Sequence, residues 1–174
     1  GDGNKVEIDK QPGLTIGGML AAQDLDVLWV VGANPLEDAA LAAPGAFVVV
    51  QDLFLTETAY LADVVLPASA FPEKTGTFTN TDRTVQLGRQ ALDPPGDARQ
   101  DLWIIVEMAK RLGLDWTYAH PRDVFAEMRR AMPSIAGITW ERLEAEHAVT
   151  YPCEQEGDPG EPVIFTESFP TASG

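Results

Sequence analysis

Three short runs of wholly apolar residues constrain the fold more than any other feature of this sequence. They span residues 27–31, 47–50 and 64–66, and each ends at Gly, at Pro or at a polar pair. Strands that are apolar on both sides suit a parallel sheet covered on both faces. The segments between them, residues 36–43 and 56–62, are compatible with short helices. This alternation predicts an α/β fold with a three-layer, open, mostly parallel sheet and flanking helices, similar to a Rossmann fold.

The rest of the chain predicts further helices and a hairpin. Residues 99–112 carry apolar side chains at helical spacing and are followed by Gly, a common helix terminator. Residues 121–132 begin with Pro and end before another Pro, and residues 139–147 begin with a capping Thr. Residues 15–22 can open a short helix in the same way. Residues 76–87, with β-prone residues around an Asn-Thr-Asp turn, predict a loop or an irregular hairpin.

The composition predicts one folded domain within a longer polypeptide. We expect an α/β domain over residues 14–147, preceded by a polar linker or extended tail at 1–13. Residues 148–174 are rich in Pro, Gly and Glu, and we expect an irregular tail there. Because the sequence starts with neither an initiator Met nor a signal peptide, we expect it to be a fragment of a larger subunit.

The charge and the scarcity of metal-binding side chains exclude several classes of function. Asp and Glu number 27 against 12 Lys and Arg, and the formal net charge is −15. This field repels nucleic acids and anionic membranes, and no apolar run approaches the ~20 residues of a membrane-spanning helix. The single cysteine, Cys153, and two histidines, His120 and His147, argue against a disulfide or a metal site. We find no catalytic motif, so no catalytic residue and no metal ligand is predicted.

Ligands of open α/β sheets bind outside the carboxyl ends of the strands, where two loops carry suitable residues. Gly32, Asn34 and Pro35 follow the first run, and Pro suits the start of a helix whose N-terminus favours phosphate. The alternative is a tight turn without a ligand. Gln51 and Asp52 follow the second run. A carboxylate there can accept hydrogen bonds from a ribose diol or from guanine, or it can cap the following segment.

Two further segments have polar side chains with more than one interpretation. Thr56 and Thr58 either face a ligand or cap a short helix. Residues 73–80 combine charges, hydroxyls, an amide and a flexible Gly, which suits a heteroaromatic ligand such as a pterin or a solvated loop. Arg83 either binds an anion or pairs with a neighbouring carboxylate. The candidates in this second segment are Glu73, Lys74, Gly76, Thr77, Asn80 and Arg83.

Taken in order, these motifs resemble the molybdopterin oxidoreductases. Two later stretches, residues 136–140 and 151–153, resemble the formate dehydrogenase alpha subunit and its assimilatory nitrate reductase relatives. Thr84 departs from the family pattern, which commonly has a second Arg there. The main resemblance is carried by residues 28–35, 50–59, 62–68 and 73–86.

The resemblance implies a bis(molybdopterin guanine dinucleotide) cofactor that carries molybdenum or tungsten, one half of which is held by an α/β domain of this kind. The loop at residues 32–35 is then expected to face the dinucleotide, and Asp52 its guanosine end. Thr56 and Thr58 are expected near the phosphates or ribose. Residues 73–80 are expected to approach the pterin. The resemblance also implies that the metal ligand and the iron–sulfur clusters lie in segments outside this chain, and that residues 148–174 lead towards a C-terminal barrel domain that completes the cofactor cleft.

The function implied is that of part of a formate dehydrogenase, which oxidises formate to carbon dioxide in a two-electron reaction. Its partners are then the rest of the parent subunit and other redox subunits, in the cytoplasm or alternatively the periplasm, and the isolated chain is expected to be inactive. Two alternatives are an assimilatory nitrate reductase and the cofactor-free domain of the large iron–sulfur subunit of complex I. Asp82 before Arg83 favours the cofactor-binding branch. A free-standing carrier module is a third alternative.

Overall fold

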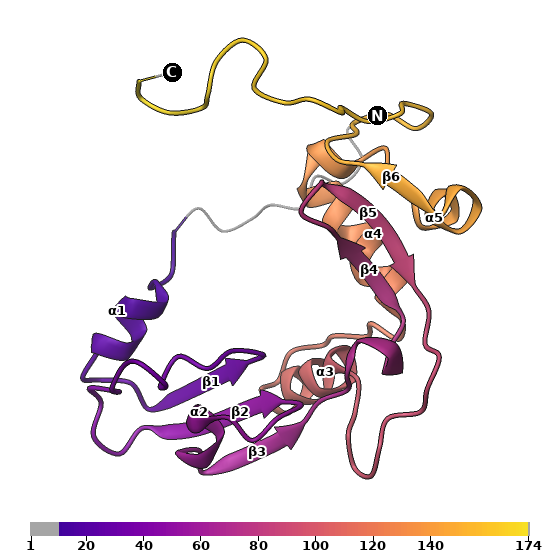
Figure 1. The fold of residues 1–174 in the computed structure, drawn as a ribbon. Helices are drawn as coiled ribbons and strands as arrows, with labels where there is room; N and C mark the ends of the chain where they lie inside the picture. The colour runs from indigo at the N-terminus through magenta and orange to yellow at the C-terminus, as the bar shows by residue number, and fades with distance from the viewer. Residues whose placement is uncertain (1–10, 174) are drawn as a thin grey trace. The chain divides into compact units, whose positions relative to one another are not determined.

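The computed structural model describes residues 11–173, which form two compact units (Figure 1). The described part of the parallel-sheet unit comprises residues 11–74 and 90–117. The described part of the antiparallel-sheet unit comprises residues 75–89 and 118–173. The chain therefore passes from the first unit to the second, returns, and ends in the second. The domain boundaries expected from the sequence stay a prediction.

The parallel-sheet unit is built on three strands in the order β1-β2-β3, all parallel, with arrows that point the same way in Figure 1. The strands are β1 (Val27–Val31), β2 (Phe47–Asp52) and β3 (Val64–Pro67). Val50 of β2 is opposite Val30 in β1 and Val65 in β3. β2 is thus central and has the most buried side chains of the three strands. The α/β fold with a parallel sheet is confirmed.

Two short helices cover one face of this sheet. They are α1 (Ile16–Ala21) and α2 (Glu57–Tyr60). Leu20 of α1 and Ala59 of α2 belong to the same buried apolar cluster as Val50. Each helix is capped by the side chain of the preceding Thr, which accepts a hydrogen bond from a backbone N–H of the first turn. Both predicted helix starts are confirmed.

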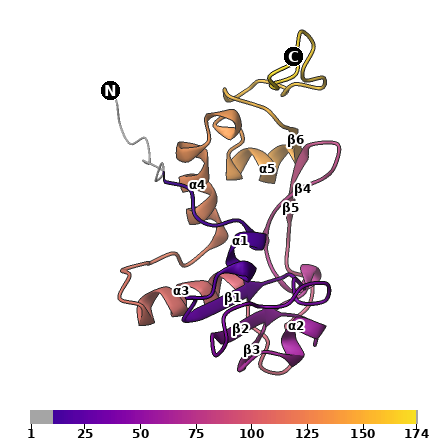
Figure 2. The same cartoon turned by 90° about the vertical axis from the view of Figure 1, so that its left-hand side faces the viewer.

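The opposite face of the sheet is covered by α3 (Asp101–Arg111), so that α2 and α3 lie on opposite sides in Figure 2. Successive side chains along a strand point to opposite faces of the sheet. Val50 faces α2, so Gln51, the next residue, points to the opposite face, where it donates a hydrogen bond to Asp101, the first residue of α3. The N–H of Arg99 donates to the carbonyl of Pro67 at 3.0 Å and ties the start of α3 to the end of β3. A 3-10 helix, η1 (Phe71–Glu73), follows β3.

The helix expected at residues 36–43, between β1 and β2, is wrong, because these residues form turns, bends and irregular chain. Two backbone donors of the segment are used elsewhere. The N–H of Leu36 donates to the hydroxyl of Thr58 at 3.0 Å, and that of Ala42 donates to the carbonyl of Leu20 at 2.8 Å. These contacts bind the segment to α2 and α1 in place of the i→i−4 bonds of a helix.

The antiparallel-sheet unit has three strands in the order β4-β5-β6. They are β4 (Gly76–Thr79), β5 (Thr84–Gly88) and β6 (Ala148–Thr150). The predicted hairpin is confirmed as a regular one, closed by a hydrogen bond of 3.0 Å from the N–H of Asn80 to the carbonyl of Thr84. Residues 148–150 were expected to be irregular, but they form β6 and pair with β5. Residues 151–173 contain no helix or strand, as expected.

Two helices and a 3-10 helix cover this second sheet. They are α4 (Pro121–Ala131), η2 (Pro133–Ile135) and α5 (Trp140–Glu146). The bounds of α4 and α5 are close to the predicted ones, and η2 was not predicted. No helix within residues 11–173 is long and apolar enough to cross a membrane. The buried cluster of this unit consists of Val85, Phe125, Ile135, Ile138, Trp140, Leu143, Val149 and Cys153.

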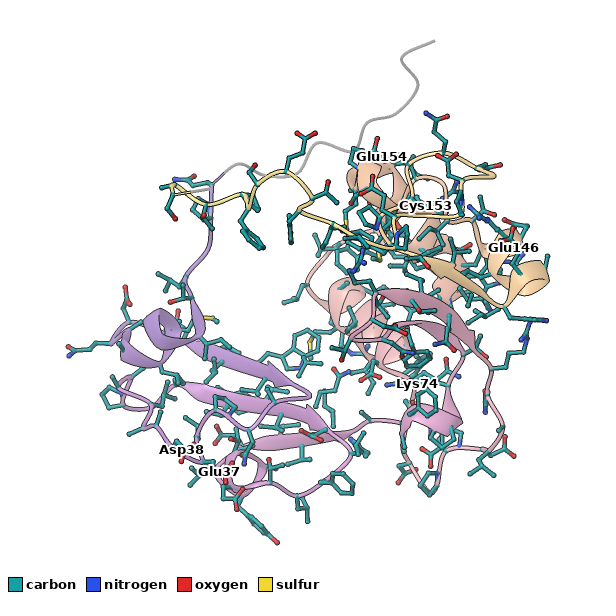
Figure 3. The ribbon with its side chains drawn as sticks, turned by 45° about the horizontal axis from the view of Figure 1, so that its top comes forward. Glu37, Asp38, Lys74, Glu146, Cys153 and Glu154 are labelled. Carbon is teal, nitrogen blue, oxygen red and sulfur yellow. The ribbon has the colours of Figure 1, made fainter. Side chains whose placement is uncertain are left out.

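Arginine side chains hold the C-terminal tail on this unit. Arg142 donates to the carbonyl of Asp158 at 2.6 Å and to the sulfur of Cys153 at 3.3 Å. Cys153, labelled in Figure 3, is buried in the core cluster. Within the described part of the chain, no group of three or more His, Cys, Asp and Glu side chains is arranged to hold a metal ion. Because Cys153 is buried among apolar side chains, it packs as part of the core.

Truncation of Leu143 tests the core of the antiparallel-sheet unit. Leu143 is fully buried, so we expect Leu143→Ala to lower the free energy of unfolding by about 2–5 kcal/mol. Leu112→Ala is the control, since Leu112 is 71% exposed and its truncation leaves no cavity. Urea denaturation followed by circular dichroism measures both. Equal losses in the two variants would contradict this packing.

Candidate functional site

The carboxyl ends of β1 and β2 bring the first predicted residues together. The N–H of Gly32 donates to the carbonyl of Gln51 at 2.9 Å, so the two loops leave the sheet side by side. Gly32 has a φ of 58°, and a Cβ added there would meet no atom within 4 Å. The backbone at Gly32 is therefore open to the close approach of another group.

Asn34 joins the loop after β1 to α2. Its Oδ1 accepts hydrogen bonds from the backbone N–H of Thr58 at 3.0 Å and from the Thr58 hydroxyl at 2.7 Å. Because a backbone N–H can only donate, this contact fixes which end of the amide is oxygen. The Nδ2 group consequently donates to carboxylates, to Glu57 at 2.7 Å and to Glu37 at 3.0 Å. One amide thus holds two carboxylates close together.

These two carboxylates make the loop pair electronegative. The pKa of Glu57 is lowered, first by a hydrogen bond from its own backbone N–H and then by the Asn34 amide. Neither Glu57 nor Glu37 forms an ion pair with a described basic residue. Figure 3 labels Glu37 and its neighbour Asp38 in the loop that leaves β1. Such a surface repels phosphate and favours ligands that donate hydrogen bonds.

Asp52 ends β2 on the face that carries α2. Its Oδ1 accepts hydrogen bonds from the N–H groups of Leu53 at 2.7 Å and Phe54 at 3.3 Å, so it caps its own turn. Its Oδ2 accepts no hydrogen bond from the residues that the structure describes. The three residues that follow are exposed and apolar, with Phe54 at 69% exposure between Leu53 and Leu55. Asp52 therefore offers an acceptor beside an apolar surface.

The remaining residues of these loops have supporting contacts. Thr56 accepts a hydrogen bond of 3.2 Å from the N–H of Ala59 and caps α2, which is one of the two interpretations of the sequence. Thr58 is fully buried and orients Asn34. Pro35 begins a turn, and because no helix follows it, the helix N-terminus expected to favour phosphate there is missing.

A partly buried polar contact on the other face involves Gln51, Lys74 and a residue that the sequence did not indicate. The Nε2 of Gln51 donates to Asp101 at 2.9 Å, and Lys74 forms an ion pair with the other oxygen of Asp101. Glu73 instead caps η1 by accepting a hydrogen bond of 2.8 Å from the N–H of Ala70. Asp101 follows Gln51 by 50 positions, and no local pattern connects them.

The other four predicted residues belong to the antiparallel-sheet unit. Thr77 lines an apolar pocket of about 240 Å³ together with Phe125, and Gly76 is open, with no atom within 4 Å of an added Cβ. Asn80 closes the hairpin turn. Arg83 uses its guanidinium to hold the C-terminal tail of this unit. Its acceptors are the carbonyl oxygens of Tyr151, Glu161 and Pro162, at 2.6, 2.9 and 2.7 Å.

The parallel-sheet unit thus belongs to the open α/β class, and it has an open Gly and a carboxylate at the strand ends, where folds of this class bind their ligands. The family model of the molybdopterin oxidoreductases matches residues 2–111. The chain belongs to the molybdopterin oxidoreductase family, which confirms the resemblance in the sequence.

Relatives carry names from the formate dehydrogenases. The chain is 40% identical over 182 residues to the F420-dependent formate dehydrogenase subunit alpha of Methanocaldococcus jannaschii, covering 98% of this chain and 27% of the relative. It is 48% identical to a putative formate dehydrogenase of Staphylococcus aureus, covering 71% of this chain and 12% of the relative. A solved structure, acetylene hydratase from Pelobacter acetylenicus, is 26% identical with a TM-score of 0.49, covering 69% of this chain and 16% of that one. The chain spans about a quarter or less of these proteins.

The hydrogen bond from Asn34 predicts how Glu57 titrates. Since Asn34 stabilises the charged carboxylate, Asn34→Ala should raise the pKa of Glu57 part of the way to its ordinary value. The stabilisation that this bond gives the folded chain is present above the ordinary pKa and is lost as pH falls through the lowered one. Carboxyl ¹³C NMR titration measures the pKa.

Glu107 serves as the internal control for this titration. Its pKa is also lowered, but by Arg111 and Lys110, so Asn34→Ala should leave it unchanged. An unaltered pKa of Glu57 in the variant, or equal shifts at both carboxylates, would show that Asn34 does not hold Glu57.

Proposed function

We propose that this chain is the part of a formate dehydrogenase-type molybdopterin oxidoreductase that holds one of two molybdopterin guanine dinucleotides. The observation that carries the proposal is Asp52, a carboxylate with an open oxygen at the end of the central strand. Gly32 supplies accessible backbone at the neighbouring strand end. Membership in the family supports a molybdopterin ligand.

The chemistry of these side chains fits the nucleoside end of the cofactor. Guanine N1–H and N2–H, or the ribose hydroxyls, can donate to the open oxygen of Asp52. The exposed apolar side chains of Leu53, Phe54 and Leu55 offer a surface for the base. Glu37 and Glu57 favour donors and disfavour phosphate at Asn34. The proposed arrangement therefore places guanosine at these loops and the phosphates away from Asn34.

In the proposed function, this chain binds and orients one of the two dinucleotide cofactors. The cofactor, with molybdenum or tungsten, supplies a centre that exchanges two electrons when bound. We propose that the parent enzyme oxidises formate to carbon dioxide, which the names of its relatives support over nitrate reduction. Its partners are then the rest of the parent subunit and iron–sulfur redox subunits, in the cytoplasm. No residue of this chain is proposed as catalytic.

Loss of the Asp52 carboxylate tests the proposal. We expect guanosine to shift backbone amide resonances at Gly32 and at residues 52–55 in the wild-type chain. Asp52→Ala should weaken this binding about 10- to 100-fold, as expected for a hydrogen bond to a charged group. NMR titration with guanosine measures the dissociation constant.

Asp24→Ala is the matched control, because Asp24 is an exposed carboxylate that precedes β1, at the opposite end of the strand from Gly32. Its substitution should leave guanosine binding unchanged. Equal affinity of wild-type and Asp52→Ala chains, or shifts confined to other residues, would refute the assignment of guanosine to Asp52.

A further inference from the structure

A single carboxylate, that of Asp101, holds two of the predicted cofactor-binding residues. One oxygen accepts from the side-chain amide of Gln51 at 2.9 Å, and the other pairs with the ammonium of Lys74. Gln51 lies at the end of β2, and Lys74 directly follows η1. Asp101 therefore links two segments that are separate in the sequence.

The side chain of Gln51 depends on this contact. It is fully buried, and its Oε1 has no hydrogen-bond partner, so within the described chain the bond to Asp101 is the one made by the amide. A buried amide without any partner is costly. The carbonyl of Gln51 accepts from the N–H of Gly32, and the next residue is Asp52. A movement of Gln51 would thus displace both strand ends of the proposed site.

Asp101 can hold Gln51 in place because the start of α3, where Asp101 lies, is attached to the end of β3. The N–H of Arg99 donates to the carbonyl of Pro67 at 3.0 Å, and the carbonyl of Arg99 accepts from the N–H of Ser69 at 2.9 Å. These bonds attach the segment before α3 to the end of β3. A side chain on a fixed element holds its partners more accurately than one on a free loop.

We propose that Asp101 is a positioning residue, which holds Gln51 so that Gly32 and Asp52 keep the geometry of the guanosine site. The ligand in this inference rests on the proposed function. The effect of Asp101 on the hydrogen bond between Gly32 and Gln51 requires no ligand. The positioning role of Asp101 and the binding of guanosine can therefore fail separately.

The first readout is amide hydrogen exchange at Gly32 in the ligand-free full chain. Asp101→Ala should raise the exchange rate about tenfold or more, in keeping with the loss of a hydrogen bond to a charged group. Asp101→Asn keeps an acceptor for Gln51 and should stay within about threefold of wild type. Glu107→Ala is the matched control, since Glu107 lies on α3, is 28% exposed against 29% for Asp101, and pairs with basic residues.

A second variant, Gln51→Met, separates loss of the Gln51–Asp101 hydrogen bond from general unfolding of the Asp101→Ala chain. Gln51→Met removes the buried amide that needs a partner, so in that background Asp101→Ala should have no added effect on Gly32 exchange. An added effect as large as in the wild-type background would overturn the inference. So would equal exchange in the Asp101→Ala and Glu107→Ala chains.

The second readout is the affinity for guanosine, measured by NMR titration. Asp101→Ala should weaken binding about tenfold, while Asp101→Asn and Glu107→Ala should remain within about threefold of wild type. Unchanged affinity in Asp101→Ala would refute the positioning role. If wild-type chain binds no guanosine, the proposed function fails, and the exchange rates still decide whether Asp101 holds the strand end.

Discussion

The parallel pairing of β2 with β1 and β3 is the constraint on which the proposed site depends. Because the three strands run in the same direction, their carboxyl ends meet at one edge of the sheet. That edge places Gly32 next to Gln51, and Asp52 one residue further on. The buried centre of β2, with Val50 fully inaccessible, fixes the register of this edge.

Buried polar side chains then set the geometry of the loops. On one face of the sheet, Thr58 fixes the amide of Asn34, which in turn holds Glu57. On the other face, Asp101 holds Gln51. In the first case a fully buried side chain determines where more exposed ones lie, and in the second a partly exposed carboxylate holds a fully buried amide. An interior of low polarity makes such contacts expensive to break. The site is thus built by packing against helices as much as by the strands.

Features encoded by neighbouring residues were predictable from the sequence, and those that depend on distant partners were not. The apolar strand runs and the Thr56 and Thr139 caps are local signals, and the structure has them at the predicted places. Residues 36–43 contain helix-forming residues, but their backbone donors bond to α1 and α2. The role of Asp101 depends on a partner 50 positions away, and Arg83 binds carbonyls at least 68 positions away.

Intermolecular nuclear Overhauser effects, which locate guanosine on the chain, test whether the carboxyl ends of β1 and β2 form its binding site. If guanosine binds beside Asp52, its base and ribose protons should show contacts with the methyl groups of Leu53 and Leu55, which are exposed there. Contacts confined to methyl groups of the antiparallel-sheet unit, or none under saturating guanosine, would contradict binding there.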